Sequence, residues 1–138
     1  MRVFVDTNVL VSAVATRGLC ADVMREVLSA HELVVTRQVL DEVGEVIVRK
    51  FGADPALAAE YVGLLEQEAT IVRPAGLAGV ELRDRDDVPI LGAAVAARVE
   101  LFVTGDRELQ KLRKTGGVET VSPRRFWERL KSGGRRRP

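Results

Sequence analysis

The sequence predicts an α/β protein with three layers, in which helices cover both faces of a mostly parallel sheet of about five strands. Short apolar runs alternate along the chain with stretches of helical periodicity, and several of the runs are apolar at every position. Uniformly apolar strands are typical of a parallel sheet buried on both faces. The length of 138 residues fits one domain. We place this domain at residues 1–131, followed by a flexible basic tail over 132–138.

The expected elements follow from hydrophobic periodicity and from the residues that interrupt it. Strands are expected at 2–5, 32–35, 70–73, 101–104 and 118–121. Helices are expected at 8–15, 19–30, 37–50, 55–68, 88–98, 107–114 and 123–131. Thr36, Asp54-Pro55 and Ser122-Pro123 are start signals for three of these helices, and Gly52 follows the end of one.

The composition excludes several classes of protein. Hydrophobic residues make up 46% of the chain and charged residues 30%, which rules out disorder or a coiled coil as a description of the whole. No apolar run approaches the ~20 residues of a membrane span, and the first residues do not form a signal peptide. We therefore expect a soluble cytoplasmic protein. The single cysteine, Cys20, cannot form an internal disulfide or build a zinc site alone.

The net charge of +1 conceals an asymmetry between two parts of the chain. Residues 1–106 carry a formal charge of −7, and residues 107–138 carry +8. An acidic body with a basic end suggests a cation site beside a surface that binds a polyanion. Solvated charges that segregate without function are the alternative.

Two aspartates follow predicted strands. Asp6 ends the first strand, and Asp106 follows the fourth after one glycine. The carboxyl ends of parallel strands open onto one edge of the sheet, where α/β proteins bind their ligands. A single aspartate in this position is more often a helix cap than a catalytic residue, and the presence of two after separate parallel strands favours a shared site.

A third carboxylate comes from the run Asp84-Arg85-Asp86-Asp87, which opens the alanine-rich helix. Acidic residues at a helix start also cap it and complement its dipole, so this cluster has a purely structural explanation. We expect Asp86 to be the cap, Asp87 to face inward and Asp84 to be peripheral.

A fourth carboxylate comes from the helix after Thr36. On a helical wheel, Glu42 lies at the border of the buried stripe, whereas Asp41 and Glu45 lie on the solvent side. Glu42 is therefore the acid of this helix that can point along the edge of the core. An amphipathic border residue without a further role is the alternative.

Carboxylates that converge need a counter-charge. Two like charges ~4 Å apart repel by roughly 4 kcal/mol at an effective dielectric of 20. With oxygen ligands only, Mg²⁺ or Mn²⁺ is expected and zinc is not. Thr7, Asn8 and Ser12 would add hydroxyl or amide contacts around Asp6.

Five segments spread over about residues 2–130 carry a recognisable pattern. They are Val3-Phe4-Val5-Asp6-Thr7-Asn8-Val9-Leu10, Val39-Leu40-Asp41-Glu42-Val43, Asp84-Arg85-Asp86-Asp87-Val88-Pro89-Ile90-Leu91, Phe102-Val103-Thr104-Gly105-Asp106 and Val121-Ser122-Pro123-Arg124-Arg125-Phe126. In this order they resemble the PIN domain, and within it the VapC-like toxin components of bacterial toxin–antitoxin pairs.

This resemblance implies a metal-dependent ribonuclease that hydrolyses RNA phosphodiester bonds. Asp6, Glu42, Asp87 and Asp106 match the acidic quartet of the family, with Asp84, Asp86 and Thr104 in supporting positions. On our hypothesis Asp6 and Asp106 hold the principal ion, and Asp87 completes its site or holds a second ion. Glu42 orients the attacking water or accepts its proton. The resemblance further implies a small antitoxin partner and a homodimer, for which residues 9–14 and 54–68 are candidate interfaces or ordinary core.

The basic end of the chain supplies candidate phosphate contacts that do not read sequence. They are Arg107, Lys111, Arg113, Lys114, Arg124 and Arg125. Phe126 and Trp127 are expected to anchor the last helix to the core rather than to stack on bases. The rival interpretations are a receiver-like acidic Mg²⁺-binding domain and a non-catalytic PIN-like module that acts through protein–protein interaction.

Overall fold

The computed structural model describes residues 1–135 of the chain. Its centre is a six-stranded sheet in the order β3-β2-β1-β4-β6-β5. Neighbouring strands are parallel except for β5, which runs antiparallel to β6. The strands are β1 (Arg2–Val5), β2 (Glu32–Thr36), β3 (Thr70–Val72), β4 (Leu101–Val103), β5 (Lys114–Thr115) and β6 (Val118–Val121).

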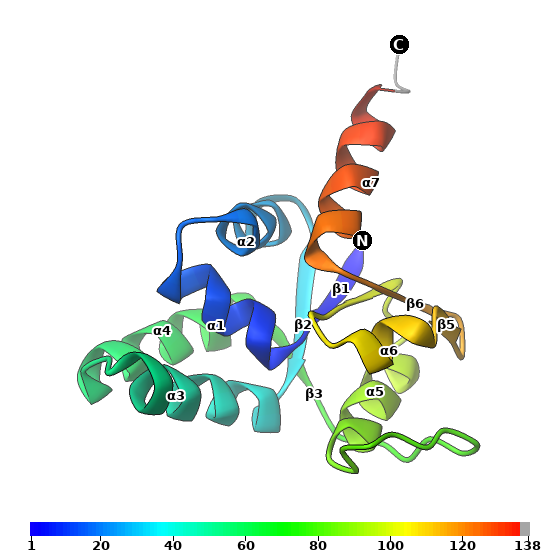
Figure 1. Ribbon diagram of the computed structural model, residues 1–138, viewed down its shortest axis with the longest axis horizontal. Helices are drawn as coiled ribbons and strands as arrows, with labels where there is room; N and C mark the ends of the chain where they lie inside the picture. Colours follow the sequence, from blue (N-terminus) through cyan, green and yellow to red (C-terminus); the bar gives the residue numbers. More distant parts are fainter. Residues whose placement is uncertain (136–138) are drawn as a thin grey trace.

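Helices cover both faces of the sheet, which confirms the predicted three layers. Figure 1 shows α1, α2, α3 and α4 on one side of the strands and α5 and α6 on the other. The helices are α1 (Thr7–Ala15), α2 (Leu19–Ala30), α3 (Arg37–Phe51), α4 (Pro55–Glu68), α5 (Asp87–Ala96), α6 (Arg107–Lys111) and α7 (Pro123–Arg135). Within residues 1–135, no helix combines the length and apolar character that crossing a bilayer requires.

The central strands form the core because their side chains are apolar on both faces. Residues 3–5 of β1 and all of β4 are buried. Phe4 and Phe102 are register partners on these neighbouring strands, and their rings stack with centroids 5.0 Å apart. Phe126 anchors α7 with no exposed surface, and Trp127 packs beside it against the core, as predicted.

The predicted start and stop signals act as expected. The Thr36 hydroxyl accepts from the backbone N–H of Val39 over 3.2 Å and caps α3. Gly52 ends this helix with a left-handed backbone, at φ 65°. The Asp54 carboxylate accepts from the N–H of Ala56 over 2.8 Å and caps α4.

The largest differences from the predicted boundaries lie in the basic end of the chain, and elsewhere the boundaries move by one or two residues, as in α5, which was expected at 88–98 and spans Asp87–Ala96. The sixth strand, β5, was not predicted, and the helix expected to reach Lys114 ends at Lys111. The chain reverses at Arg113, whose φ is 58°, and Lys114–Thr115 then pair with β6. The last helix continues past Lys131 to Arg135. The remainder of the expected tail, 136–138, lies outside the described residues.

Candidate active site

The site lies where the order of the strands reverses. From β1 the sheet extends to β2 and β3 on one side and to β4 on the other. A reversal of this kind leaves a crevice at the carboxyl ends of the two central strands, where open α/β sheets bind ligands. Asp6 directly follows β1, and Thr104 and Asp106 follow β4. The structure therefore brings the two strand-end aspartates to one edge, as predicted.

Asp6 is the most buried carboxylate of this edge, with 8% of its surface exposed. Its Oδ1 accepts from the backbone N–H of Thr7 over 2.8 Å, at the start of α1. Its Oδ2 accepts from the hydroxyl of Thr104 over 2.7 Å. Burial raises the pKa of Asp6, the two hydrogen bonds oppose this rise, and the charge of Asp106 adds to it.

Asp106 begins α6 and is tied to the same threonine. Its Oδ1 accepts from the backbone N–H of Glu108 over 2.8 Å, so the carboxylate caps the helix. Its own backbone N–H donates to the Thr104 hydroxyl over 3.0 Å. One hydroxyl therefore links the two strand-end aspartates.

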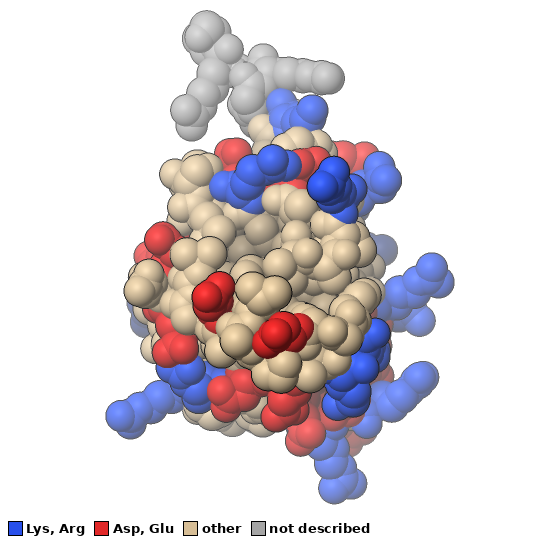
Figure 2. Space-filling model, turned by 90° about the vertical axis from the view of Figure 1, so that its left-hand side faces the viewer, with Lys and Arg blue, Asp and Glu red and all other residues tan. Residues whose placement is uncertain are grey.

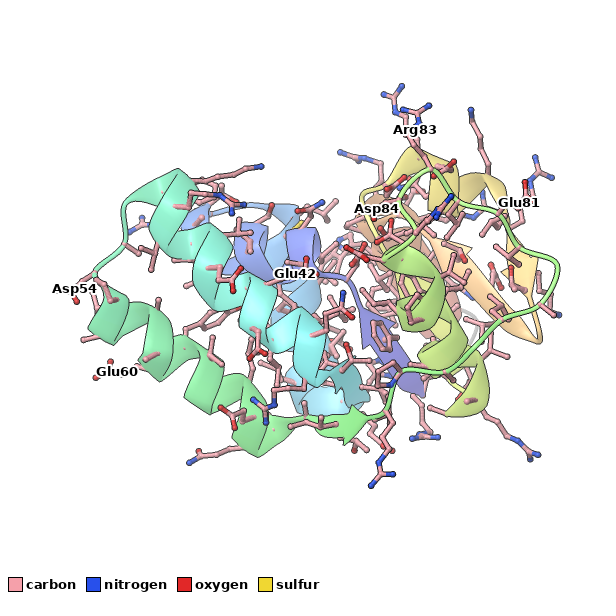
Figure 3. All side chains as sticks on the ribbon, turned by 90° about the horizontal axis from the view of Figure 1, so that it is seen from below. Glu42, Asp54, Glu60, Glu81, Arg83 and Asp84 are labelled. Atoms are coloured by element: carbon pink, nitrogen blue, oxygen red, sulfur yellow. The ribbon has the colours of Figure 1, made fainter. Side chains whose placement is uncertain are left out.

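Glu42 reaches the edge from α3, where it is half-buried as the helical wheel predicted. Its two carboxylate oxygens accept from the Thr7 hydroxyl over 3.5 Å and from the Gln38 amide over 3.4 Å. Burial is the main cause that raises the pKa of Glu42, and the charges of Asp6 and Asp84 add to it. Figure 3 shows Glu42 on α3 and Asp84 ahead of α5, on opposite sides of the end of β1.

Asp87 also has a raised pKa. Burial, followed by the negative charges of Asp6, Asp84, Asp106 and Glu42, raises its pKa to about 7. A carboxylate that is affected by four others lies among them, so the five acids share one region of the edge.

The expected helix cap at Asp86 is confirmed in its position but not in its hydrogen bond. Asp86 occupies the position before α5, but its carboxylate makes no capping hydrogen bond within the described chain. Its backbone is helical, with φ −69° and ψ −21°, whereas a side-chain cap needs an extended backbone. Asp84 instead accepts from the N–H of Asp86 over 3.0 Å and so shapes the turn. Asp86 itself is exposed to solvent.

The other predicted supporting residues divide into two groups. Thr7 and Thr104 are buried and hydrogen-bond to the carboxylates. Asn8 is exposed and Ser12 half-buried, and among residues 1–135 neither side chain makes a hydrogen bond to the acidic group.

The sequence reasoning missed three residues that hold this edge in place. Gln38 lies one turn before Glu42 on α3, a spacing that would have revealed it. Glu108 accepts from the backbone N–H of Arg83 with both carboxylate oxygens, at 3.0 and 3.1 Å. Gln110 donates to the backbone carbonyl of Thr104 over 2.8 Å. No sequence signal identifies the last two contacts, because they join segments through the backbone.

The donor set of the edge fits a hard divalent cation. Its acidic groups offer carboxylate oxygens, burial together with the neighbouring negative charges raises the pKa of Asp87 to about 7, and Mg²⁺ and Mn²⁺ prefer oxygen ligands. Within the described chain, no three acidic, histidine or cysteine side chains are already positioned to hold a metal. Binding an ion therefore requires the side chains to rotate toward one another.

Predicted cationic residues lie on both sides of α6. A cavity of about 650 Å³ is bordered by Asp84, Asp106, Arg107 and Lys111, so these two cations lie beside the acidic edge. A second cavity, of about 560 Å³, is lined by residues that include Arg113, Lys114 and Arg125. Arg124 is exposed on the first turn of α7 and lines neither cavity.

The fold and this edge define an α/β protein with a carboxylate cluster at the switch point of its sheet. The family model of the PIN domain matches residues 2–108, and the chain belongs to this family, whose members are generally nucleases and depend on divalent metals. This confirms the family resemblance that the motifs indicated.

Comparison with solved structures gives the same architecture. The chain is similar to one in the crystal structure of VapBC2 from Rickettsia felis bound to a DNA fragment from their promoter. The two are 12% identical, with a TM-score of 0.64, and the match covers 88% of this chain and 98% of the other. This likeness shows a shared fold. A search of curated proteins found no significant match.

Proposed function

We propose that this protein is a metal-dependent ribonuclease that hydrolyses RNA phosphodiester bonds and is the toxin of a toxin–antitoxin pair. The observation that carries the proposal is the meeting of Asp6, Glu42, Asp87 and Asp106 at one sheet edge, in a chain of the PIN family. These residues come from four separate segments, and mutual repulsion disfavours such a grouping unless the site has a use for negative charge.

Asp6, Asp87 and Asp106 are the residues that would hold Mg²⁺ or Mn²⁺. When bound, such an ion lowers the pKa of a coordinated water and neutralises charge on the attacked phosphate. Asp6 and Asp106 have little freedom, because Thr104 and the first turns of α1 and α6 hold them. The side chain of Asp87 makes no hydrogen bond among the described residues and can rotate toward the other two.

Glu42 is suited to orient the attacking water or to accept its proton. Burial and neighbouring charge raise its pKa, and a base works best when its pKa approaches the working pH. Thr7 and Gln38 donate to its two oxygens and hold the carboxylate in one orientation.

Arg107 and Lys111 supply positive charge for the substrate. They border the same cavity as Asp84 and Asp106. Cations beside an acidic metal site attract the phosphates of an RNA strand to that site, in a way that weakens with salt.

An antitoxin or a second copy of the chain would cover an apolar surface on the side of the molecule that faces away from α6. Val14, Phe51 and Leu57 are 49, 52 and 62% exposed. Figure 2 views this side of the molecule, where charged side chains are sparse over a broad area. Within the candidate interface at 9–14, Val14 is the exposed apolar residue, because residues 9–11 are buried in the core.

The proposal is tested by incubating the purified chain with a panel of RNAs, with Mg²⁺, with Mn²⁺ and with a chelator. We expect cleavage that requires the metal and that is lost in Asp6→Ala, with the circular dichroism spectrum unchanged. Asp41→Ala is the matched control, because Asp41 is an exposed acid of α3 next to Glu42. Cleavage retained in Asp6→Ala would contradict the proposal, and a metal-binding chain without cleavage would favour the non-catalytic alternative.

A further inference from the structure

The cavity beside β6 is separate from the acidic edge, and α6 lies between the two. Its walls include the cationic side chains of Arg113, Lys114 and Arg125 and the hydroxyl-bearing residues Thr120 and Ser122. Arg107 and Lys111, both of which belong to α6, border the cavity at the acidic edge instead. An RNA strand that contacts both sets of cations would therefore pass over α6.

Thr120 shows that the β6 cavity has an unused polar group in its wall. The residue is 5% exposed, and its hydroxyl has no hydrogen-bond partner in the described chain. Its backbone N–H is already paired, with the carbonyl of Arg113 over 2.8 Å. Buried hydroxyls without a partner are rare in folded proteins, and a ligand is one of the few explanations for them.

The charge of the β6 cavity is positive on balance. Its one acidic wall residue, Glu119, forms an ion pair with Arg129 over 2.7 Å, so its charge is already compensated from outside the cavity. Arg113, Lys114 and Arg125 make no ion pair within residues 1–135. Their charges remain available to an anion.

The thirteen-residue helix α7 starts at this cavity and adds to its positive character. The Ser122 hydroxyl accepts from the N–H of Arg125 over 3.1 Å, and its carbonyl accepts from the N–H of Phe126 over 2.9 Å. A helix start carries partial positive charge, which favours a phosphate group nearby.

We infer that the β6 cavity binds a phosphate group of the RNA strand, at a distance from the bond that is cut. Thr120, whose buried hydroxyl has no partner in the described chain, and the three cations described above line one cavity at the start of α7, and together they favour an anion with several acceptor oxygens. The inference that this phosphate belongs to RNA rests on the proposed function. The site itself does not depend on cleavage.

The first test titrates inorganic phosphate into the full chain and follows backbone amide shifts by NMR, with chloride at equal ionic strength as the reference. We expect saturable shifts at Thr120, Ser122 and Arg125 in the wild type. They should be lost in the double variant Lys114→Ala, Arg125→Ala. Shifts that chloride reproduces, or that appear elsewhere, would overturn the site.

The second test measures binding of a short single-stranded RNA by fluorescence anisotropy in chelator, so that no cleavage occurs. The double variant should bind more weakly, and its salt slope should fall by about 0.7 for each lost phosphate contact. Arg73→Ala is the matched control, because Arg73 is exposed and follows β3 at the opposite edge of the sheet. Equal weakening in the control would overturn the site.

Substitutions of Thr120 test the role of its hydroxyl without changing the charge of the β6 cavity. Thr120→Val should weaken RNA binding about five-fold, the usual effect of one hydrogen bond, while the unliganded chain melts at the same or a higher temperature. Thr120→Ser should restore binding. Unchanged binding in Thr120→Val would overturn the role of this hydroxyl, and so the inference.

The outcomes separate this inference from the proposed function. Phosphate shifts at the β6 cavity without any RNA cleavage would support the site and contradict the nuclease. Cleavage that depends on Asp6, with normal RNA binding by the double variant, would support the nuclease and contradict the phosphate site. Phosphate binding with unchanged RNA affinity would overturn the assignment to RNA and favour an acidic partner protein.

Discussion

Thr104 and Asp6 form the shortest link in the acidic edge, with the threonine hydroxyl donating to Asp6 Oδ2 over 2.7 Å. The same hydroxyl accepts from the backbone N–H of Asp106 over 3.0 Å. Thr104 is fully buried, so water does not replace either contact. The relative position of the two aspartates therefore depends on one side chain that carries no charge.

Replacing Thr104 by valine should weaken both the fold and the site. The change preserves the shape but leaves Asp6 Oδ2 without its donor, which costs about 1–3 kcal/mol of unfolding free energy. Loss of the donor also raises the pKa of Asp6 further, so half-maximal cleavage should need more Mg²⁺. Urea unfolding and a metal titration of cleavage check these two effects. Thr104→Ser keeps the hydroxyl, and equal losses in both variants would contradict the argument.

The metal-free chain should lose stability as pH rises through the range in which Asp87 ionises. Its pKa is about 7 in the folded chain against 3.8 for an ordinary aspartate, so the folded state holds the proton more tightly. The stabilisation is fully present below about pH 4 and is lost as pH rises to about 7.

Comparing Asp87→Asn with the wild type isolates this effect, because the amide cannot ionise. In chelator, the melting temperature of the variant minus that of the wild type should increase from pH 4 to pH 7. Mg²⁺ should reduce the difference at pH 7. A difference that stays constant with pH would show that neither burial nor neighbouring charge raises the pKa of Asp87. Asp86→Asn is the control, since Asp86 is exposed.

Glu108 should control the order of the segment that carries Asp84 and Asp87. Both of its carboxylate oxygens accept from the N–H of Arg83, which fastens this segment to the start of α6. Glu108→Ala should speed hydrogen exchange at the Arg83 amide and reduce cleavage, whereas Glu108→Gln keeps an acceptor and should retain most of both. Arg83→Ala removes only the side chain, so the backbone amide at this position should stay protected. Unchanged exchange in Glu108→Ala would contradict this contact.

Gly92 should not tolerate alanine, although it lies inside a helix. A Cβ there would stand 2.0 Å from the carbonyl oxygen of Ala75, on the backbone of the segment that leads to the acidic run. The clash should lower the unfolding free energy by about 1–3 kcal/mol. Gly63 in α4 is the matched control, because its Cβ would meet no atom within 4 Å. Gly63→Ala should raise stability by about 0.5–1 kcal/mol, and a similar gain at Gly92 would contradict the close approach.

Much of the architecture could be predicted because its signals are local. The run before Asp6 is apolar on both faces, and a strand of this kind must lie in the middle of a covered sheet. Caps such as Thr36 and Asp54 act within three residues of their own positions. The half-burial of Glu42 follows from helical periodicity alone.

The basic end of the chain was predicted less well, because its structure depends on contacts between distant segments. Lys114 and Thr115 have no apolar pattern of their own and become a strand only by pairing with β6. The helix before them ends where Arg113 turns the chain back toward that strand. A two-residue strand has no periodicity for sequence reasoning to detect.

The order of strands, helices and acidic residues along the chain was enough to place Asp6 and Asp106 at one edge of the sheet and to select Asp87 as the inward-facing acid of its run. The contacts by which Thr104 and Glu108 hold this edge together became visible in the folded chain alone. The physical reason is the range of the interactions. Periodicity and capping act over a few residues, whereas burial and repulsion between carboxylates depend on segments that the fold brings together from across the chain.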